Sequence, residues 1–303
     1  MSARGWALFG VMCVTWGIPY LLIRVAVRDL SPATLVFART GGATLVLLPI
    51  AAARRELLPL LHRLAPLALF ALVEIAGPWV ALSSAERRIS SSFSALLIAA
   101  VPLVGALIAR TTGARERLGL TSLSGLLLGL GGVAALVGFD LAGTSGVALA
   151  EVALVVVGYA LGPAILARRL ADMPALGVIS ASLALTAVVY APIAAFSLPA
   201  AMPPANVLAA VAVLIVICTA LAFLLFVALI AEVGPVRATV ITYVNPAVAA
   251  ALGVGLLGER FTPGMGAGFV LILVGSLLAT RAPAPTGRRP RPLAPRRGTP
   301  AGS

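Results

Sequence analysis

Three ionisable side chains lie within long apolar stretches of this 303-residue sequence: Arg39, Glu74 and Glu151. A charge at the centre of a membrane-spanning helix costs about 2.5 to 3.5 kcal/mol on insertion scales, so each of these residues needs a partner or water. A carboxylate in such surroundings can take up and release a proton. A guanidinium can bind a carboxylate or phosphate through its planar fork. These residue types favour proton coupling and anion binding.

Glu74 lies near the middle of its apolar stretch, and helical spacing places Ala71, Gly77 and Pro78 beside it. The side chains on this face are small enough to leave room for a cavity beside Glu74. We therefore predict that Glu74 binds and releases a proton as part of the protein's function, because intramembrane ionisable groups are functional by default. The alternative is a structural Glu74 that pairs with Arg39 and holds two helices together.

Arg39 shares a helical face with Gly42 and Ala43, and it is a candidate ligand for a substrate carboxylate or phosphate. Glu151 shares a face with Tyr159 but lies near one end of its apolar stretch. For Glu151, an exposed position at the membrane rim and a functional position remain equal alternatives.

Prolines inside the apolar stretches mark a second group of residues. A proline cannot donate to the carbonyl four residues earlier and leaves that acceptor free. The residues four before Pro19, Pro78, Pro163 and Pro246 are all polar: Thr15, Glu74, Tyr159 and Thr242. Freed carbonyls beside polar side chains suit a polar site or a hinge at mid-membrane. Alternatively, the polar side chains only restore the hydrogen bonding of the broken helices.

The stretch around Pro246 is the most polar of the later helices. Pockets are mostly apolar with a few placed polar groups, so this stretch, with aromatic residues from the first half, could line a site for a partly apolar small molecule. The predicted substrate-binding or coupling residues are Glu74, Arg39, Trp16, Tyr20, Trp79, Tyr159, Thr242, Tyr243 and Asn245. Trp and Tyr also gather at membrane interfaces for reasons unrelated to ligands.

The elements that position these residues must be membrane-spanning helices. The chain is 61% hydrophobic and 11% charged, which leaves too little polar surface for a water-soluble protein of this length. Ten apolar stretches have about the 17 to 25 residues that cross a bilayer. Their limits are 5–26, 31–53, 65–85, 90–109, 118–138, 147–168, 174–197, 206–231, 235–257 and 263–281. The predicted fold class is an all-α integral membrane protein with ten transmembrane helices.

The two halves of the chain repeat one pattern. With Pro102 aligned on Pro246 and one gap, Glu116-Arg117 falls on Glu259-Arg260. The predicted units are residues 5–138 and 147–281, followed by a disordered cytoplasmic tail at 282–303. Five spans is an odd number, so the second unit is inverted relative to the first, with a binding site at mid-membrane between them. A duplicated bundle can also be a channel or scaffold.

The 22 basic residues are all arginines and concentrate in alternate gaps between spans and in the tail. This bias predicts that both termini are cytoplasmic, in a multi-pass protein of the bacterial cytoplasmic (inner) membrane. The net charge of +12 therefore reflects membrane orientation, and no nucleic acid partner is predicted. The expected partners are membrane lipid and a small-molecule substrate.

Two segments carry a resemblance to a known family: WALFGVMCVTWGIPYLLIRVAV with SPATLVFART, and TALAFLLFVALIAEVGPVRATVI. The chain resembles EamA-type members of the drug/metabolite transporter superfamily, with Trp16-Gly17, Ser31-Pro32 and Arg39 in the family's places. The resemblance implies two EamA repeats of five helices and secondary transport of small metabolites, often export. It implies an architectural Arg39 as readily as a ligand. Glu86-Arg87-Arg88 departs from the second repeat, and we expect it to end the third helix at the outer surface.

No enzyme, cofactor or metal site is predicted. The only histidine is His62, in a loop, and no lysine is present to complete a P-loop. The prediction is a proton-coupled exporter of a small metabolite, amino acid or drug. The alternatives are a proton-independent facilitator or exchanger, and a channel or scaffold. Glycines in the last span of each unit predict close-packed faces that serve either the bundle or a homodimer: Gly125, Gly129, Gly264, Gly266 and Gly268.

Overall fold

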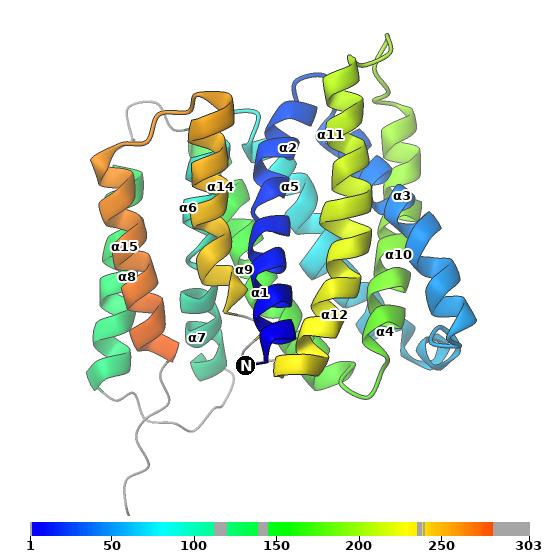
Figure 1. Ribbon diagram of the computed structural model, residues 1–303, viewed down its shortest axis with the longest axis horizontal. Helices are drawn as coiled ribbons and strands as arrows, with labels where there is room; N and C mark the ends of the chain where they lie inside the picture. The colour runs from blue at the N-terminus through cyan, green and yellow to red at the C-terminus, as the bar shows by residue number, and fades with distance from the viewer. Residues whose placement is uncertain (1, 112–119, 139–144, 235–237, 239, 281–303) are drawn as a thin grey trace, which may run out of the picture.

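The structure is a computed structural model that describes residues 2–111, 120–138, 145–234, 238 and 240–280. All regular elements in these ranges are helical, and Figure 1 shows them as one bundle. The N-terminus and the end of the last helix lie at the same end of the bundle, which we call the N-terminal face. The other end is called the distal face. The predicted tail at 282–303 and Glu116-Arg117 lie outside the described residues.

Several spans are divided into shorter elements. The first half contains α1 (Ala3–Thr15), α2 (Ile18–Ala26), α3 (Pro32–Ala53), η1 (Leu58–Arg63), α4 (Leu64–Phe70), η2 (Ala71–Ala76), α5 (Gly77–Ala85), α6 (Ser91–Ile98), α7 (Val101–Thr111) and α8 (Leu120–Gly138). The second half contains α9 (Gly146–Arg169), α10 (Ala175–Ala195), α11 (Ala205–Ile215), η3 (Val216–Leu221), α12 (Ala222–Val233), α14 (Ile241–Leu257) and α15 (Pro263–Thr280).

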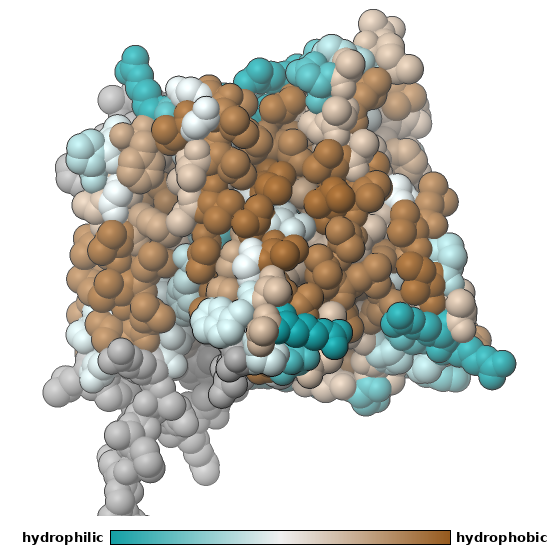
Figure 2. All heavy atoms as spheres, in the orientation of Figure 1, coloured by the Kyte–Doolittle hydropathy of each residue, from teal (hydrophilic) through white to brown (hydrophobic). Residues whose placement is uncertain are grey.

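The surface of the bundle suits lipid. Eight continuous helical segments are long and apolar enough to cross a membrane, and Leu123–Val137 and Ile241–Leu257 form shorter apolar helices. Figure 2 shows a broad band of apolar residues between polar residues at the two ends. Leu45 is 79% exposed and Val188 is 70% exposed, positions that water would not favour. The predicted all-helical membrane class is therefore confirmed.

The two halves interleave within the bundle. The helix pairs that join one half to the other include α3 with α10, α5 with α9, α6 with α14, α8 with α15, α2 with α11, and α1 with α12. Each half therefore completes its packing against the other. The main apolar core likewise draws on both halves, with Phe93 and Leu96 from the first and Val155 and Leu214 from the second.

Glycines allow α8 and α15 to pack with their backbones close together. A Cβ atom at Gly132 would lie 2.8 Å from the main-chain oxygen of Gly268, and one at Gly268 would lie 3.0 Å from the oxygen of Gly132. Gly125 and Gly275 face the same contact. This packing is the small-residue contact expected between membrane helices. Between α8 and α15, the predicted glycine face therefore serves the bundle; a homodimer stays a prediction.

The third span of each half contains a π-helical segment, η2 in the first and η3 in the second. Under the repeat alignment, in which residue numbers differ by 144, η2 at 71–76 corresponds to 215–220, and η3 occupies 216–221. Each segment widens one turn and re-aims the side chains on it. Single π turns inside α-helices occur frequently at functional sites.

We expect Gly132→Ala to destabilise the protein, because its methyl group would press on the α15 backbone, and overpacking costs about 1 to 3 kcal/mol. Gly131→Ala is the matched control, since a Cβ at that neighbouring position meets nothing within 4 Å. Thermal unfolding in detergent should show a lower melting temperature for Gly132→Ala alone. Equal melting temperatures would contradict the described α8–α15 contact.

Candidate functional site

Arg39 lies buried in the bundle and is held by residues from both halves. It is 8% exposed on α3. Its Nε donates a 2.8 Å hydrogen bond to the hydroxyl of Thr219 on η3, and its guanidinium carbon lies 3.8 Å from the centre of the Trp79 ring. Stacking on an indole face stabilises a desolvated cation by about 2 kcal/mol. Arg39 therefore links α3, α5 and η3.

The Thr219 hydroxyl can accept from Arg39 because it uses its own proton elsewhere. It donates to the main-chain oxygen of Leu214, five residues earlier, at 2.7 Å. The π-helical geometry of η3 therefore fixes the orientation of the acceptor. Gly42, one turn after Arg39, lets α3 approach this segment, since a Cβ there would lie 2.7 Å from Ile215.

Glu74 lies on η2, the corresponding π-helical segment of the first half. Its Oε2 is buried and makes no hydrogen bond. Gly162 on α9 makes room for it, because a Cβ atom there would overlap this oxygen. Gly158, one turn earlier, also lets α9 pack closely against Val73 and Pro78. Two glycines of α9 thus shape the surroundings of a carboxylate on η2.

The structure does not pair these two charged residues. Arg39 and Glu74 are both described, and no ion pair joins them. The alternative that Glu74 is a structural partner of Arg39 is therefore wrong for this conformation. Arg39 instead contacts Thr219 and Trp79, and Glu74 contacts the glycine face of α9. The bundle keeps a cation and a carboxylate in separate places.

Three predicted aromatic residues surround this polar core. Trp79 supports Arg39 and is 7% exposed. Tyr159 on α9 packs against both the cluster that contains Trp79 and the one that contains Tyr20. Tyr20, on α2, is 8% exposed. The fold thus brings Arg39, Trp79, Tyr159 and Tyr20 into one region, with Glu74 one turn of α9 away beside Gly162.

The remaining predicted residues lie where the first span breaks. Trp16 is the C-cap of α1, and it contacts Phe223 and Phe226 with ring centres 5.9 and 4.7 Å apart. In the amide orientation that pairs donors with acceptors, the nitrogen of Asn245 donates to the carbonyl of Cys13 at 3.0 Å. Asn245 therefore satisfies an acceptor that the break leaves free. Both residues have local packing roles, and substrate contact by them stays a prediction.

Thr242 and Tyr243 follow the start of α14 and are partly buried. Gly17, in the break between α1 and α2, packs against α14, where a Cβ would lie 2.6 Å from Val248. This contact brings the first span of one half against the ninth predicted span of the other. The break between α1 and α2 therefore lies beside α14, which continues through Pro246 without a break.

A carboxylate clasp joins the halves at the distal face. Glu259 follows α14, and its Oε1 accepts from the main-chain nitrogen and the hydroxyl of Ser91 at 2.8 and 2.9 Å. Its Oε2 accepts from the main-chain nitrogen and the hydroxyl of Ser92 at 2.8 and 2.5 Å. These donors form the N-terminus of α6, where a negative charge is favoured. Gly253 permits the approach, since a Cβ there would overlap Ser92 and Glu259.

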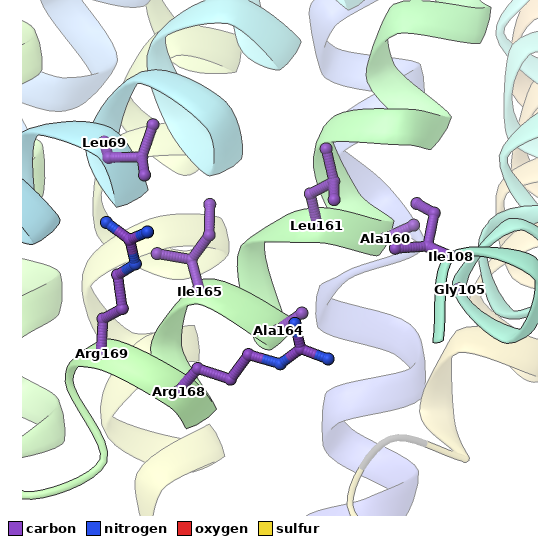
Figure 3. A pocket seen from close by; sticks show the side chains of 9 residues that line it. All are labelled: Leu69, Gly105, Ile108, Ala160, Leu161, Ala164, Ile165, Arg168 and Arg169. Atoms are coloured by element: carbon purple, nitrogen blue, oxygen red, sulfur yellow. The ribbon is translucent and has the colours of Figure 1, made fainter. Parts of the chain in front are cut away.

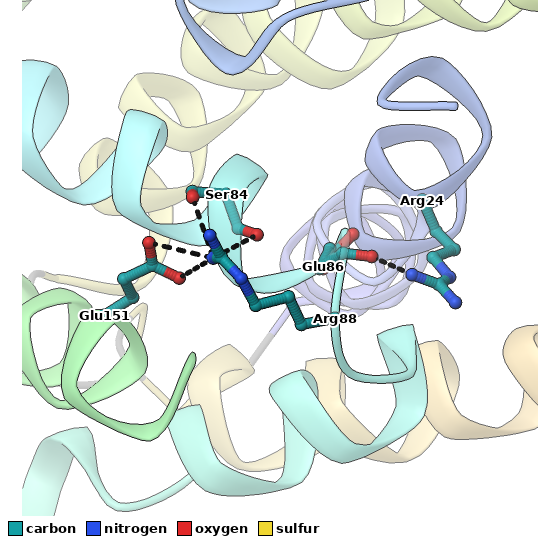
Figure 4. Close-up of polar contacts among 5 residues, drawn as sticks. All are labelled: Arg24, Ser84, Glu86, Arg88 and Glu151. Atoms are coloured by element: carbon teal, nitrogen blue, oxygen red, sulfur yellow. Dashed lines mark hydrogen bonds and ion pairs between the residues drawn. The ribbon is translucent and has the colours of Figure 1, made fainter. Parts of the chain in front are cut away.

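Charged residues beside the clasp differ from expectation in one respect. Helix α5 ends at Ala85, as the Glu86-Arg87-Arg88 sequence predicts, but the Glu86 side chain is 0% exposed and turns inward. Arg24 donates to its main-chain oxygen, so α2 caps the end of α5 (Figure 4). Arg88 instead forms a 3.0 Å ion pair with Glu151 on α9. Glu151 is therefore a partner at the rim.

Two of the hollows on the surface of the described residues bear on the site, and neither is lined by Arg39 or Glu74. One, of about 240 Å³, lies among α4, α7 and α9, with Arg168 and Arg169 of the last turn of α9 beside an apolar wall (Figure 3). The other, of about 290 Å³, is lined by Arg24, Val27, Arg28 and Arg87. Within the described residues, no group of three His, Cys, Asp or Glu side chains is arranged to hold a metal.

The profile of the EamA-like transporter family matches residues 3–138 and 144–281. The chain belongs to this family. It is 29% identical, over 262 residues, to the uncharacterized inner membrane transporter YedA of Escherichia coli strain K12, covering 84% of this chain and 83% of that protein. The same identity holds for YedA of strain O157:H7. A crystal structure of a protein 20% identical covers 92% of this chain and 98% of its own, with a TM-score of 0.65, and it supports the fold.

Family membership makes this chain a membrane transporter, so its buried charged residues gain significance. Several contact residues were not predicted from sequence. Thr219, Gly162 and the Ser91-Ser92 pair are individually unremarkable in apolar or serine-rich segments. Glu259 could have been singled out, because it recurs at the equivalent place in both repeats. Its partners could not, since they lie 167 and 168 residues away.

The clasp predicts a pH dependence of stability. Burial would raise the pKa of Glu259, but the hydrogen bonds from Ser92 and Ser91 outweigh burial and lower the pKa. A lowered pKa contributes stability that is present above the unfolded value, about 4.3, and is lost as pH falls through the folded value. We therefore expect Glu259→Gln to lower the melting temperature at neutral pH, with the difference from wild type shrinking below about pH 4.

The exposed Glu232, which accepts one hydrogen bond from Ser2, provides the control variant Glu232→Gln. Its melting curve should follow wild type closely. A Glu259→Gln deficit that stays constant from neutral to acidic pH would show that the clasp does not depend on the charge.

Proposed function

We propose that this chain is a secondary active transporter that exports a small metabolite, amino acid or drug in exchange for protons. The observation that carries the proposal is Glu74: a carboxylate on a π-helical segment, with a buried oxygen that no donor satisfies. A buried ionised carboxylate without a partner is costly, so the group favours its protonated form in this conformation. When water or substrate reaches it, the proton can leave.

Arg39 supplies the complementary charge. Its guanidinium keeps one face on Trp79 and one nitrogen on Thr219, and no carboxylate pairs with it in the described chain. A desolvated cation with remaining donors suits the carboxylate or phosphate of a substrate. Tyr20 and Tyr159 add hydroxyl groups to the same region. Substrate binding at this place would lie between the two halves.

The helix contacts between the two halves support the two-fold pairing pattern that is expected for inverted repeats. The second, fourth and fifth predicted spans of each half pack on their counterparts: α3 on α10, α6 on α14, and α8 on α15. The third span of one half packs on the first span of the other, α5 on α9 and α11 on α2. A two-fold relation between ten helices would produce this pattern. Rocking of the halves would then give alternating access.

The Glu259 clasp closes the distal end in this arrangement. We assign that end to the outer side and the N-terminal face to the cytoplasm, because arginines concentrate toward the latter. The similarity to YedA, an inner membrane transporter by name, favours the bacterial cytoplasmic membrane. The units 5–138 and 147–281 would be the two moving bodies.

Two alternatives make different predictions. A proton-independent facilitator or exchanger would need Arg39 but no titrating Glu74. A channel or scaffold would need no opening of the clasp and would tolerate a crosslink between the halves. The unpaired carboxylate favours proton exchange over the first alternative, and the enclosed polar core favours alternating access over the second.

Glu74→Gln should abolish proton-driven export, because glutamine cannot exchange a proton. Gly162→Ala should impair it as well, because the added Cβ overlaps the carboxylate. Gly255→Ala is the control, since a Cβ there meets nothing within 4 Å. Bacterial cells that express wild type or each variant are compared for accumulation of amino acids, toxic analogues and cationic dyes.

We expect wild type and Gly255→Ala to lower accumulation of the same compound, and Glu74→Gln not to do so. Purified protein is then reconstituted in liposomes and supplied with that compound. In the absence of a pH gradient, Glu74→Gln should still exchange the compound across the membrane. Equal proton-driven export by wild type and Glu74→Gln would refute proton coupling through Glu74 and favour the facilitator.

A further inference from the structure

Glu86 is a second buried carboxylate, and it has no role in the proton exchange proposed for Glu74. It follows α5, its side chain is 0% exposed, and neither Oε1 nor Oε2 makes a hydrogen bond. Ordinary structural carboxylates are paired or solvated. Its main-chain oxygen accepts from Arg24, so the backbone is fixed while the carboxylate stays unsatisfied.

The surroundings of Glu86 connect the clasp to the polar core. Charged and titratable groups within electrostatic range come from four neighbouring elements and are Arg24 and Tyr20 on α2, Arg39 on α3, Tyr159 on α9, and Glu259 after α14. Burial and then the charge of Glu259 raise the pKa of Glu86 well above its usual value, against the opposing effects of Arg24 and Arg39.

A surface hollow lies close to Glu86, although the buried carboxylate does not line it. The 290 Å³ hollow is lined by Arg24, which binds the Glu86 main chain, and by Arg87, the next residue. Figure 4 shows Glu86 between Arg24 on one side and the Arg88–Glu151 pair on the other. The hollow is therefore lined by the residue that follows Glu86 in the chain and by the arginine that binds its main chain.

We propose that Glu86 is a proton-binding site at the distal end of the bundle, occupied while the Glu259 clasp on Ser91 and Ser92 is closed and emptied when the clasp opens. The step is a reversible proton transfer: a carboxylate oxygen of Glu86 gains a proton from water and later returns it to water. The inference rests on the proposed proton exchange and adds to it a gating proton that enters from the outer side and returns to it.

Charge repulsion couples the two carboxylates. Glu259 is ionised and held by four donors, so a neutral Glu86 adds no second negative charge beneath the clasp. Loss of the proton would place two carboxylates in one poorly solvated region, where like charges disfavour each other. Opening the clasp admits water and relieves that repulsion. Protonation from outside therefore closes the outer gate, which is the order that an exporter exchanging protons requires.

Infrared difference spectroscopy on purified protein in lipid measures this protonation without a substrate. A protonated carboxylic acid has a carbonyl stretch that an ionised carboxylate lacks. We expect wild type at neutral pH to show such a band, Glu86→Gln to lose one component, and Glu74→Gln to lose a different one. A Glu86→Gln spectrum identical to wild type in this region would overturn the proposal, because Glu86 would then be ionised.

Coupling to the clasp needs a second variant. Ser91→Ala with Ser92→Ala removes two of the four donors to Glu259 and should admit water. The Glu86 component should then disappear at a pH at least about one unit lower than in wild type. An unchanged midpoint in a variant that has lost the clasp would refute the coupling. If Glu86→Gln does not fold, labelled glutamate in Glu74→Gln distinguishes glutamate bands from aspartate bands, and of the two described glutamates with buried unbonded oxygens only Glu86 then remains.

The spectra separate this proposal from the transport proposal. If Glu86→Gln loses its spectral component while Glu74→Gln still exports fully with protons, the Glu86 site stands and coupling through Glu74 is overturned. If Glu74→Gln abolishes export and the wild-type spectrum holds no component that Glu86→Gln removes, coupling through Glu74 stands and the Glu86 site is overturned.

Discussion

The contact of Arg39 with Trp79 and Thr219 is the interaction on which the polar core depends. Lipid gives no compensation for a buried guanidinium, so the protein must supply an aromatic face and an oriented acceptor. The face comes from α5 of the first half, and the acceptor comes from η3 of the second. One arginine thereby fixes how the two halves meet.

The π-helical segments explain why both charged residues can be accommodated. In η3 the widened turn lets Thr219 donate to Leu214 and accept from Arg39. In η2 the equivalent turn presents Glu74 to the glycine face of α9. The same local irregularity in each half thus places a cation contact in one and a carboxylate in the other. Separation of these charges leaves each without an opposite charge beside it, which is the condition that the proposed transport roles require.

Sequence predicted the class of fold and part of the site. Apolar stretches of bilayer length gave the spans, and the cost of charge in lipid singled out Arg39 and Glu74. Tyr20, Trp79 and Tyr159 were also predicted, and they gather in the same region. The alternative of an Arg39–Glu74 pair is not found, because complementary charge says nothing about which helix faces meet.

The inward turn of Glu86 and the clasp of Glu259 were beyond sequence reasoning for a related reason. A charged triplet after a helix normally marks a solvated end, and the rotation of the last turn decides which member faces inward. The residues that satisfy Glu259 lie in the other half of the chain. Long-range partners of this kind are set by packing between repeats, which local patterns do not encode.

Distance measurement between spin labels tests most directly whether the halves move about this core. Labels at Arg87 and Arg260 report the distal face, and labels at Arg54 and Arg169 report the N-terminal face; all four residues are exposed. The native Cys13 and Cys218 are replaced by alanine. With Glu259→Gln, the account predicts a longer distal distance and a shorter distance at the N-terminal face. Distributions unchanged at both faces would contradict alternating access and indicate a rigid channel or scaffold.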